Sequence, residues 1–99
     1  MPRKKTQFVI TPELPIEGVR ATLHLSQMAS EILFGHERMT LETGWTLNRK
    51  RRLITIDTHS KPGETLALVF LGFCRREFGA EAVKVVHSSA KQVAAGSLA

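Results

Sequence analysis

The 99-residue sequence contains a single cysteine, no tyrosine and no long hydrophobic run. The lone Cys74 excludes an internal disulfide framework, which fits a protein of a reducing compartment. The longest apolar run, from Leu66 to Cys74, has about half the length that a membrane-spanning helix requires. The basic N-terminus is not followed by the apolar segment of a signal peptide. These absences predict a cytoplasmic protein with no membrane partner.

Residue types that carry catalysis or bind metals are also scarce. The chain has one aspartate, and none of its eight glutamates stands out as half of a catalytic pair. Its four histidines are scattered, without the spacing of a metal site. Cys74 lies inside an apolar run, where a thiol behaves as a small hydrophobic group. The sequence therefore predicts no catalytic residue, no metal and no cofactor, and it leans against an enzyme without excluding one.

The composition is that of one small globular domain. A hydrophobic content of 42% suffices for a modest core, and 23% charged residues is ordinary for such a chain. Basic residues mark residues 1–6 as a flexible arm, and small polar residues mark residues 88–99 as a flexible tail. The predicted organisation is a single domain over residues 7–87.

The first half of this domain predicts a strand and a helix. Residues 7–10 form a short strand that the prolines and the glycine of residues 11–18 bring to an end. Residues 19–34 predict one helix, because the apolar positions of their second half follow helical spacing. The strict alternation of their first half leaves an alternative, a strand to Leu25 followed by a short helix.

The second half predicts a hairpin, a helix and a last strand. Residues 38–48 alternate as a half-buried strand, and its apolar face consists of Met39, Leu41, Thr43, Trp45 and Leu47. Residues 51–58 are rich in β-branched residues and complete the hairpin. Residues 59–79 then predict a helix with Ser60 or Lys61 as its cap, and residues 80–86 a strand.

This element order, β-α-β-β-α-β, is that of the split βαβ or ferredoxin-like arrangement. The predicted fold class is therefore α+β, a two-layer sandwich of a four-stranded antiparallel sheet with two helices on one face. The second predicted helix is apolar on nearly all sides over residues 66–74. A helix of this kind is normally buried all round. We therefore expect a second copy of the chain to cover it, in a homodimer or higher homo-oligomer; the alternative is cover by the first helix and residues 11–18.

Basic residues gather in two segments of a chain whose net charge is +5. They are Arg49, Lys50, Arg51 and Arg52 at the hairpin turn, and Arg3, Lys4 and Lys5 in the N-terminal arm. One or two charges keep a hairpin turn solvated, and four in a row exceed that need. The leading hypothesis is therefore non-enzymatic binding of nucleic acid through its backbone phosphates.

Two further hypotheses compete with nucleic-acid binding. In one, the protein is an interaction or assembly module whose apolar helix forms the interface. In the other, it is a small-anion-binding or enzyme domain that uses the predicted helix start. That start offers His59, Ser60, Lys61 and Gly63, a combination typical of anion sites, but it matches no nucleotide-binding motif.

Overall fold

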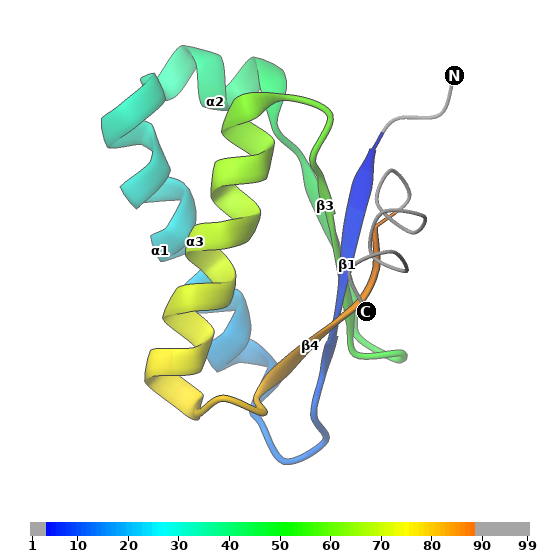
Figure 1. Ribbon diagram of the computed structural model, residues 1–99. Helices are drawn as coiled ribbons and strands as arrows, with labels where there is room; N and C mark the ends of the chain where they lie inside the picture. Colours follow the sequence, from blue (N-terminus) through cyan, green and yellow to red (C-terminus); the bar gives the residue numbers. More distant parts are fainter. Residues whose placement is uncertain (1–3, 89–99) are drawn as a thin grey trace.

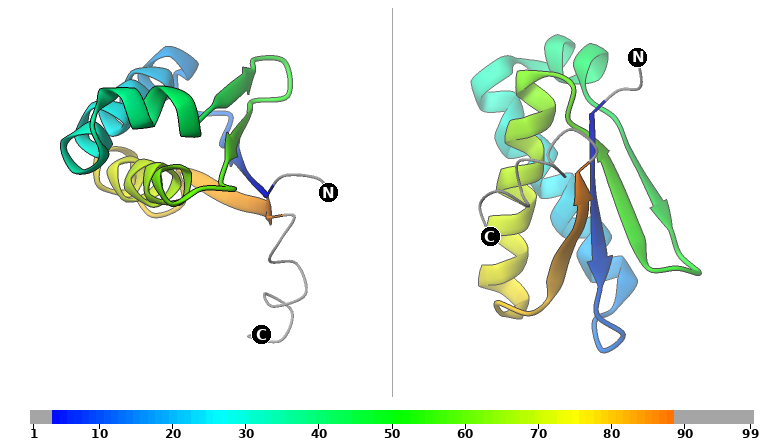
Figure 2. Two further views of the ribbon diagram at one scale, coloured as in Figure 1. Left: turned by 90° about the horizontal axis from the view of Figure 1, so that it is seen from above. Right: turned by 45° about the vertical axis from the view of Figure 1, so that its right-hand side comes forward.

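The computed structural model describes residues 4–88, which form an α+β fold of four strands and three helices. In chain order the elements are β1 (Lys5–Ile10), α1 (Ile16–Phe34), α2 (His36–Glu42), β2 (Trp45–Asn48), β3 (Leu53–Asp57), α3 (Lys61–Phe78) and β4 (Val83–Ser88). The strands, three of which are labelled in Figure 1, form one antiparallel sheet in the order β2-β3-β1-β4, which the right-hand view of Figure 2 shows. The helices lie on one side of this sheet, as the view from above shows (Figure 2). The opposite face of the sheet carries no helix in the described part of the chain.

The hydrophobic core lies between the sheet and the helices. Successive side chains of a strand point to opposite faces, so alternate residues of β1 and β3 face the helices. Buried core residues of the strands are Phe8, Ile10, Ile54 and Ile56, and those of the long helices include Val19, Leu23, Leu66 and Phe70. The rings of Phe8 and Phe70 pack edge to face with 5.3 Å between centroids. This contact joins the central strand β1 to α3.

Helix α1 confirms the prediction of one helix over residues 19–34, and it begins three residues earlier. Besides Val19 and Leu23, its buried face carries the small side chains of Thr22, Ser26 and Ser30. Helix α1 packs along α3. Small residues on a buried face allow two helices to approach closely. Because small side chains occupy much of the buried face of α1, several of its large apolar side chains lie outside the core.

The strand predicted over residues 38–48 is wrong in its first half. Residues 36–42 form helix α2, and only Trp45–Asn48 form a strand. In a strand Met39 and Leu41 would share a face, but two positions along a helix turn them about 200° apart. Met39 is accordingly buried and Leu41 exposed. The order of elements therefore contains one helix more than the predicted order.

Helix α3 agrees with its predicted cap and stop. Ser60 is the N-cap, and its side chain accepts a hydrogen bond from the Gly63 N–H; Gly79 follows the last turn with φ 106°. The helix is not buried on all sides, however, because Leu68 stays exposed while Leu66 and Phe70 are buried. Helix α1, which is one part of the alternative stated above, packs along another flank of α3.

Two boundaries of the sheet differ from the predicted domain limits. Strand β1 begins at Lys5 and takes in the last residues assigned to the arm, and β4 ends at Ser88, the first residue assigned to the tail. Within residues 4–88, no helix combines the length and the apolar composition needed to cross a bilayer.

Candidate functional site

The four consecutive cations form the turn between β2 and β3, as predicted, but two of them are bound within the molecule. Arg49 forms an ion pair with Glu17 in the first turn of α1. The hydrogen bond from Arg49 lowers the pKa of the Glu17 carboxyl, and the positive charges of Arg49 and Arg20 act in the same direction. Arg49 is therefore already matched by a carboxylate.

Arg52 has a structural position rather than a place on the open surface. Its guanidinium donates hydrogen bonds to the backbone carbonyls of Ile10 (3.4 Å), Thr11 (2.9 Å) and Leu14. Its own carbonyl accepts from the N–H of Ile10 at 2.9 Å. The side chain is half-buried, and its backbone φ is 51°. Arg52 thus ties the hairpin turn to the loop that leads from β1 into α1.

Lys50 and Arg51 are the cations of this turn that remain open to solvent. Both are exposed, and neither side chain contacts a carboxylate among residues 4–88. The backbone N–H of Arg51 donates to the Asn48 side chain at 3.0 Å, which stabilises the turn without using the charge. The exposed positive charge at the tip is therefore smaller than the run of four suggests.

The N-terminal cations lie at the other end of the sheet. Lys5 is opposite Asp57, while Asn48, at the hairpin end, is in register with Leu53 and through it with Val9. Lys5 and Val9 are four residues apart on β1, a separation of about 14 Å. Figure 1 shows the N-terminal end of β1 far from the turn after β2. The structure does not bring the two predicted basic segments together, and Arg3 lies outside the described residues.

Trp45, the single tryptophan, packs against the core. Its ring meets that of His24 of α1 edge to face, with 5.5 Å between centroids. Stacking of nucleic-acid bases needs an exposed aromatic face. Trp45 is only half-exposed and has a ring neighbour, so the described basic turn has no aromatic platform beside it.

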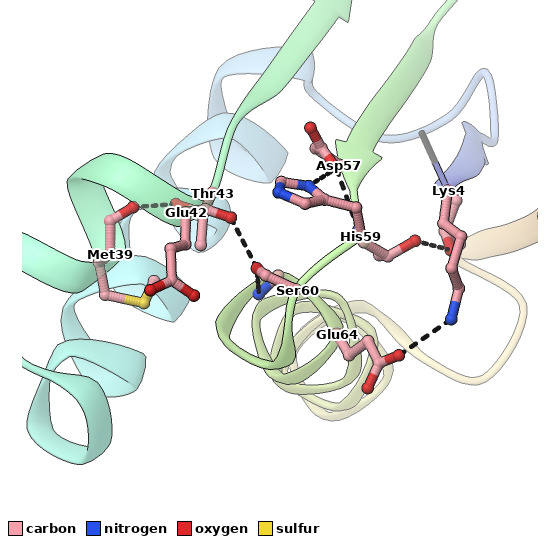
Figure 3. A network of polar contacts seen from close by, with 11 residues as sticks. Lys4, Met39, Glu42, Thr43, Asp57, His59, Ser60 and Glu64 are labelled. Atoms are coloured by element: carbon pink, nitrogen blue, oxygen red, sulfur yellow. Dashed lines mark hydrogen bonds and ion pairs between the residues drawn. The ribbon is translucent and has the colours of Figure 1, made fainter. Parts of the chain in front are cut away.

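The predicted anion site at the start of α3 is largely occupied by the protein's own groups (Figure 3). The Ser60 hydroxyl donates to the Glu42 carbonyl at 2.7 Å and accepts from the Gly63 N–H at 3.2 Å. The His59 ring contacts the Asp57 carboxylate, which also accepts from the His59 N–H at 3.1 Å. Ser60 therefore caps the helix and joins it to α2, and a negative charge stands beside His59.

Gly63 is needed for packing at this helix start. A Cβ at this position would lie 2.2 Å from the Asp57 carbonyl oxygen, closer than any real contact. Of the four residues predicted to hold an anion, Lys61 is the one whose side chain is exposed and forms no hydrogen bond or ion pair with another described residue.

Helix α1 carries an exposed apolar surface. We define the outer face of α1 as Leu25, Met28, Ile32 and Leu33, all exposed large hydrophobic residues. Helical spacing in this segment correctly predicted a helix, but these residues lie on its outer side, and Ile32 is 85% exposed. A hollow of about 260 Å³ lies between Leu25 of α1 and Phe73 of α3, and Thr22, Arg76 and Glu77 complete its lining, so its α3 side is charged.

Residues 4–88 hold no group of three or more His, Cys, Asp or Glu side chains placed to bind a metal ion. The chain matches no protein-family model, no curated protein and no solved structure. The assignment of function therefore rests on the geometry of these surfaces.

Proposed function

We propose that the protein is an assembly module that pairs with a second copy of itself through the outer face of α1. One observation carries this proposal: four large hydrophobic side chains of α1 are exposed, and three of them, Leu25, Met28 and Ile32, follow the i, i+3, i+7 spacing of a single stripe. Single exposed hydrophobic residues are common, whereas contiguous apolar patches mark interaction surfaces. None of the four residues is ionisable, so two copies can meet here without repulsion between like charges.

The proposed partner is a second copy because the outer face of α1 is complementary to itself. In an antiparallel pair of α1 helices related by a two-fold axis between Met28 and Ala29, Leu25 meets Ile32 of the other copy. Met28 then meets the small Ala29, which gives a large residue opposite a small one. Two-fold interfaces use the same patch on both subunits in this way.

The size of the outer face of α1 sets the expected strength of the dimer. A helix of 19 residues is about 28 Å long and about 10 Å wide, so a pair of α1 helices covers less than the area of a standard interface, about 800 Å² per partner. The expected dimer is therefore a weak one, confined to α1.

Sedimentation velocity over a range of concentrations, comparing the native chain with Ile32→Ser, tests this proposal. Burial of an exposed Ile side chain contributes about 2 kcal/mol, and each dimer contains two copies of Ile32. The substitution should therefore weaken dimerisation by about 4 kcal/mol, roughly a thousandfold in the dissociation constant.

Leu68→Ser is the matched control, because Leu68 is 71% exposed on α3 but lies outside the outer face of α1. It should leave the dimer intact. A native chain that sediments at the monomer mass of 11.0 kDa at every concentration would contradict the proposal. If Ile32→Ser and Leu68→Ser weakened dimerisation equally, the interface would not lie on the outer face of α1.

A second candidate function is weak nucleic-acid binding at the hairpin tip, supported by the exposed charges of Lys50 and Arg51. Two phosphate contacts predict a slope in log K against log salt of about −1.8 for a duplex and about −1.4 for a single strand. Anisotropy of labelled duplex and single-stranded oligonucleotides should show these slopes, and Lys50→Gln with Arg51→Gln should abolish them. The salt dependence distinguishes the two functions. Nucleic-acid binding should weaken as the salt concentration rises. Dimerisation through an apolar surface should not weaken, because salt screens the repulsion between two copies that each have a net charge of +5.

We also infer that the fold is a ferredoxin-like arrangement with one additional helix. The sheet order β2-β3-β1-β4 and its antiparallel neighbours support this inference, and α2 is then an insertion between the first helix and the second strand.

A further inference from the structure

A second concave surface lies on the opposite flank of α3 from α1. It is a groove of about 370 Å³ between α3 and the strands β1 and β4. Phe8, Leu68, Leu71 and Val85 form its apolar part. Small-molecule sites have volumes of about 300–1,000 Å³ and combine mostly apolar walls with a few polar groups. The groove has the size and the composition of such a site.

The polar end of the groove carries one positive and one negative charge. Lys4, just before β1, and Glu64, in the first turn of α3, line the groove together. Their Nζ and Oε2 atoms are 3.1 Å apart, and Figure 3 shows the pair bridging the strand and the helix. Each side chain is 42% exposed. Ion pairs at this exposure contribute little to stability, so a ligand can replace the partner of either group at small cost.

We propose that this groove binds a free α-amino acid with an apolar side chain. The ligand carboxylate pairs with the Lys4 ammonium, and the ligand ammonium pairs with the Glu64 carboxylate. The apolar side chain covers Leu68 and Val85, which are 71% and 50% exposed in the free protein. The site is independent of the outer face of α1.

The pair of opposite charges is what selects this class of ligand. A fatty acid brings only a carboxylate, which Glu64 would repel. A peptide segment separates its terminal charges by its whole length. In a free amino acid the carboxylate, the ammonium and the apolar side chain are all attached to the α-carbon. This arrangement matches the groove, in which Lys4 and Glu64 are adjacent and lie beside an apolar wall.

The test is a titration of the ¹⁵N-labelled full chain followed by amide chemical shifts. L-phenylalanine should cause saturable shifts at residues of the groove and none at the outer face of α1. Glycine lacks the side chain, and N-acetylphenylalanine amide lacks both charges, so each should bind at least tenfold more weakly. The absence of saturable shifts with phenylalanine, leucine and tryptophan would overturn the proposal, as would equal binding of the uncharged amide.

Substitutions separate the two charges. Lys4→Met and Glu64→Gln should each weaken binding at least tenfold. The matched controls are Lys84→Met and Glu81→Gln, because these residues form another exposed ion pair near β4, at 3.9 Å, that does not line the groove. Weakening by the controls to the same extent would overturn the proposal.

Exchange of the two charges gives the most specific outcome. Swapping the ammonium and the carboxylate on a tetrahedral carbon, with the side chain held in place, produces the opposite enantiomer. The double variant Lys4→Glu with Glu64→Lys should therefore bind phenylalanine with its enantiomeric preference reversed. If the preference stays the same, the two charges do not hold the ligand and the proposal fails.

Discussion

Replacing Arg52 by methionine removes three hydrogen bonds to backbone carbonyls while it keeps a side chain of similar length. The bond to Thr11 is 2.9 Å long, that to Ile10 is longer at 3.4 Å, and the third acceptor is Leu14. Hydrogen bonds to charged groups contribute about 1.5–3 kcal/mol each when buried. Because this side chain is half-exposed and water can replace it in part, we expect a total loss of about 2 kcal/mol.

Thermal and urea unfolding followed by circular dichroism measure this loss. For a domain of this size, 2 kcal/mol lowers the melting temperature by about 10 °C. Arg51→Met removes the same charge from the same turn without breaking a side-chain contact, so its free energy of unfolding should change by no more than about 0.5 kcal/mol. Arg52→Lys should fall between the two, since a single ammonium lacks the planar fork of donors that reaches several carbonyls.

The comparison of Arg51 and Arg52 decides whether the structural assignment of Arg52 is correct. Equal stability of Arg51→Met and Arg52→Met would refute it. In that case Arg52 would join Lys50 and Arg51 as a cation free to contact phosphates, and the hairpin tip would have three such residues for nucleic-acid binding.

Three further predictions concern other described positions. Gly63→Ala should destabilise the fold by about 2 kcal/mol, because its Cβ would overlap the Asp57 carbonyl. Gly72→Ala should stabilise the fold by about 1 kcal/mol, because nothing lies within 4 Å of the added Cβ and alanine favours a helix. Thermal unfolding of the two variants and the native chain measures both effects. Because the hydrogen bond from Arg49 lowers the pKa of Glu17, the pair should stabilise the fold fully above pH 4.5, the ordinary pKa, and this stabilisation should be lost as the pH falls through the lowered pKa. In a ¹³C NMR titration, Arg49→Gln should raise the titration midpoint of the Glu17 carboxyl. An unchanged midpoint would count against the ion pair. Burial raises the pKa of the Cys74 thiol to about 12, so a thiol reagent at pH 8 should label the native chain only as fast as it unfolds; rapid labelling without denaturant would contradict this burial.

Local sequence determined most of the secondary structure. Ser60, Pro62 and Gly79 predicted the limits of α3, because caps and stops act on backbone groups within one turn. The β-branched run before Asp57 predicted β3, and the apolar spacing after Leu25 predicted a helix there. The error at α2 has the same origin. A seven-residue helix has too few apolar positions to distinguish a helical period from a strand period.

Only the tertiary structure decided which of the predicted functional residues remain available. Arg49 meets Glu17 across 32 positions, Arg52 meets Thr11 across 41, and Lys4 meets Glu64 across 60. No local pattern encodes such contacts, because they depend on where the sheet register and the helix packing bring distant segments.

The same holds for the exposed hydrophobic residues. Periodicity identifies an apolar side of α1, but the approach of α3 determines which side is buried. By itself the sequence determined that this is a basic α+β domain with a charged turn and apolar helices. The packing of α1 on α3 decided that the outer face of α1 and the groove beside β4 are among its open surfaces, since a side chain is buried only where another element comes to cover it.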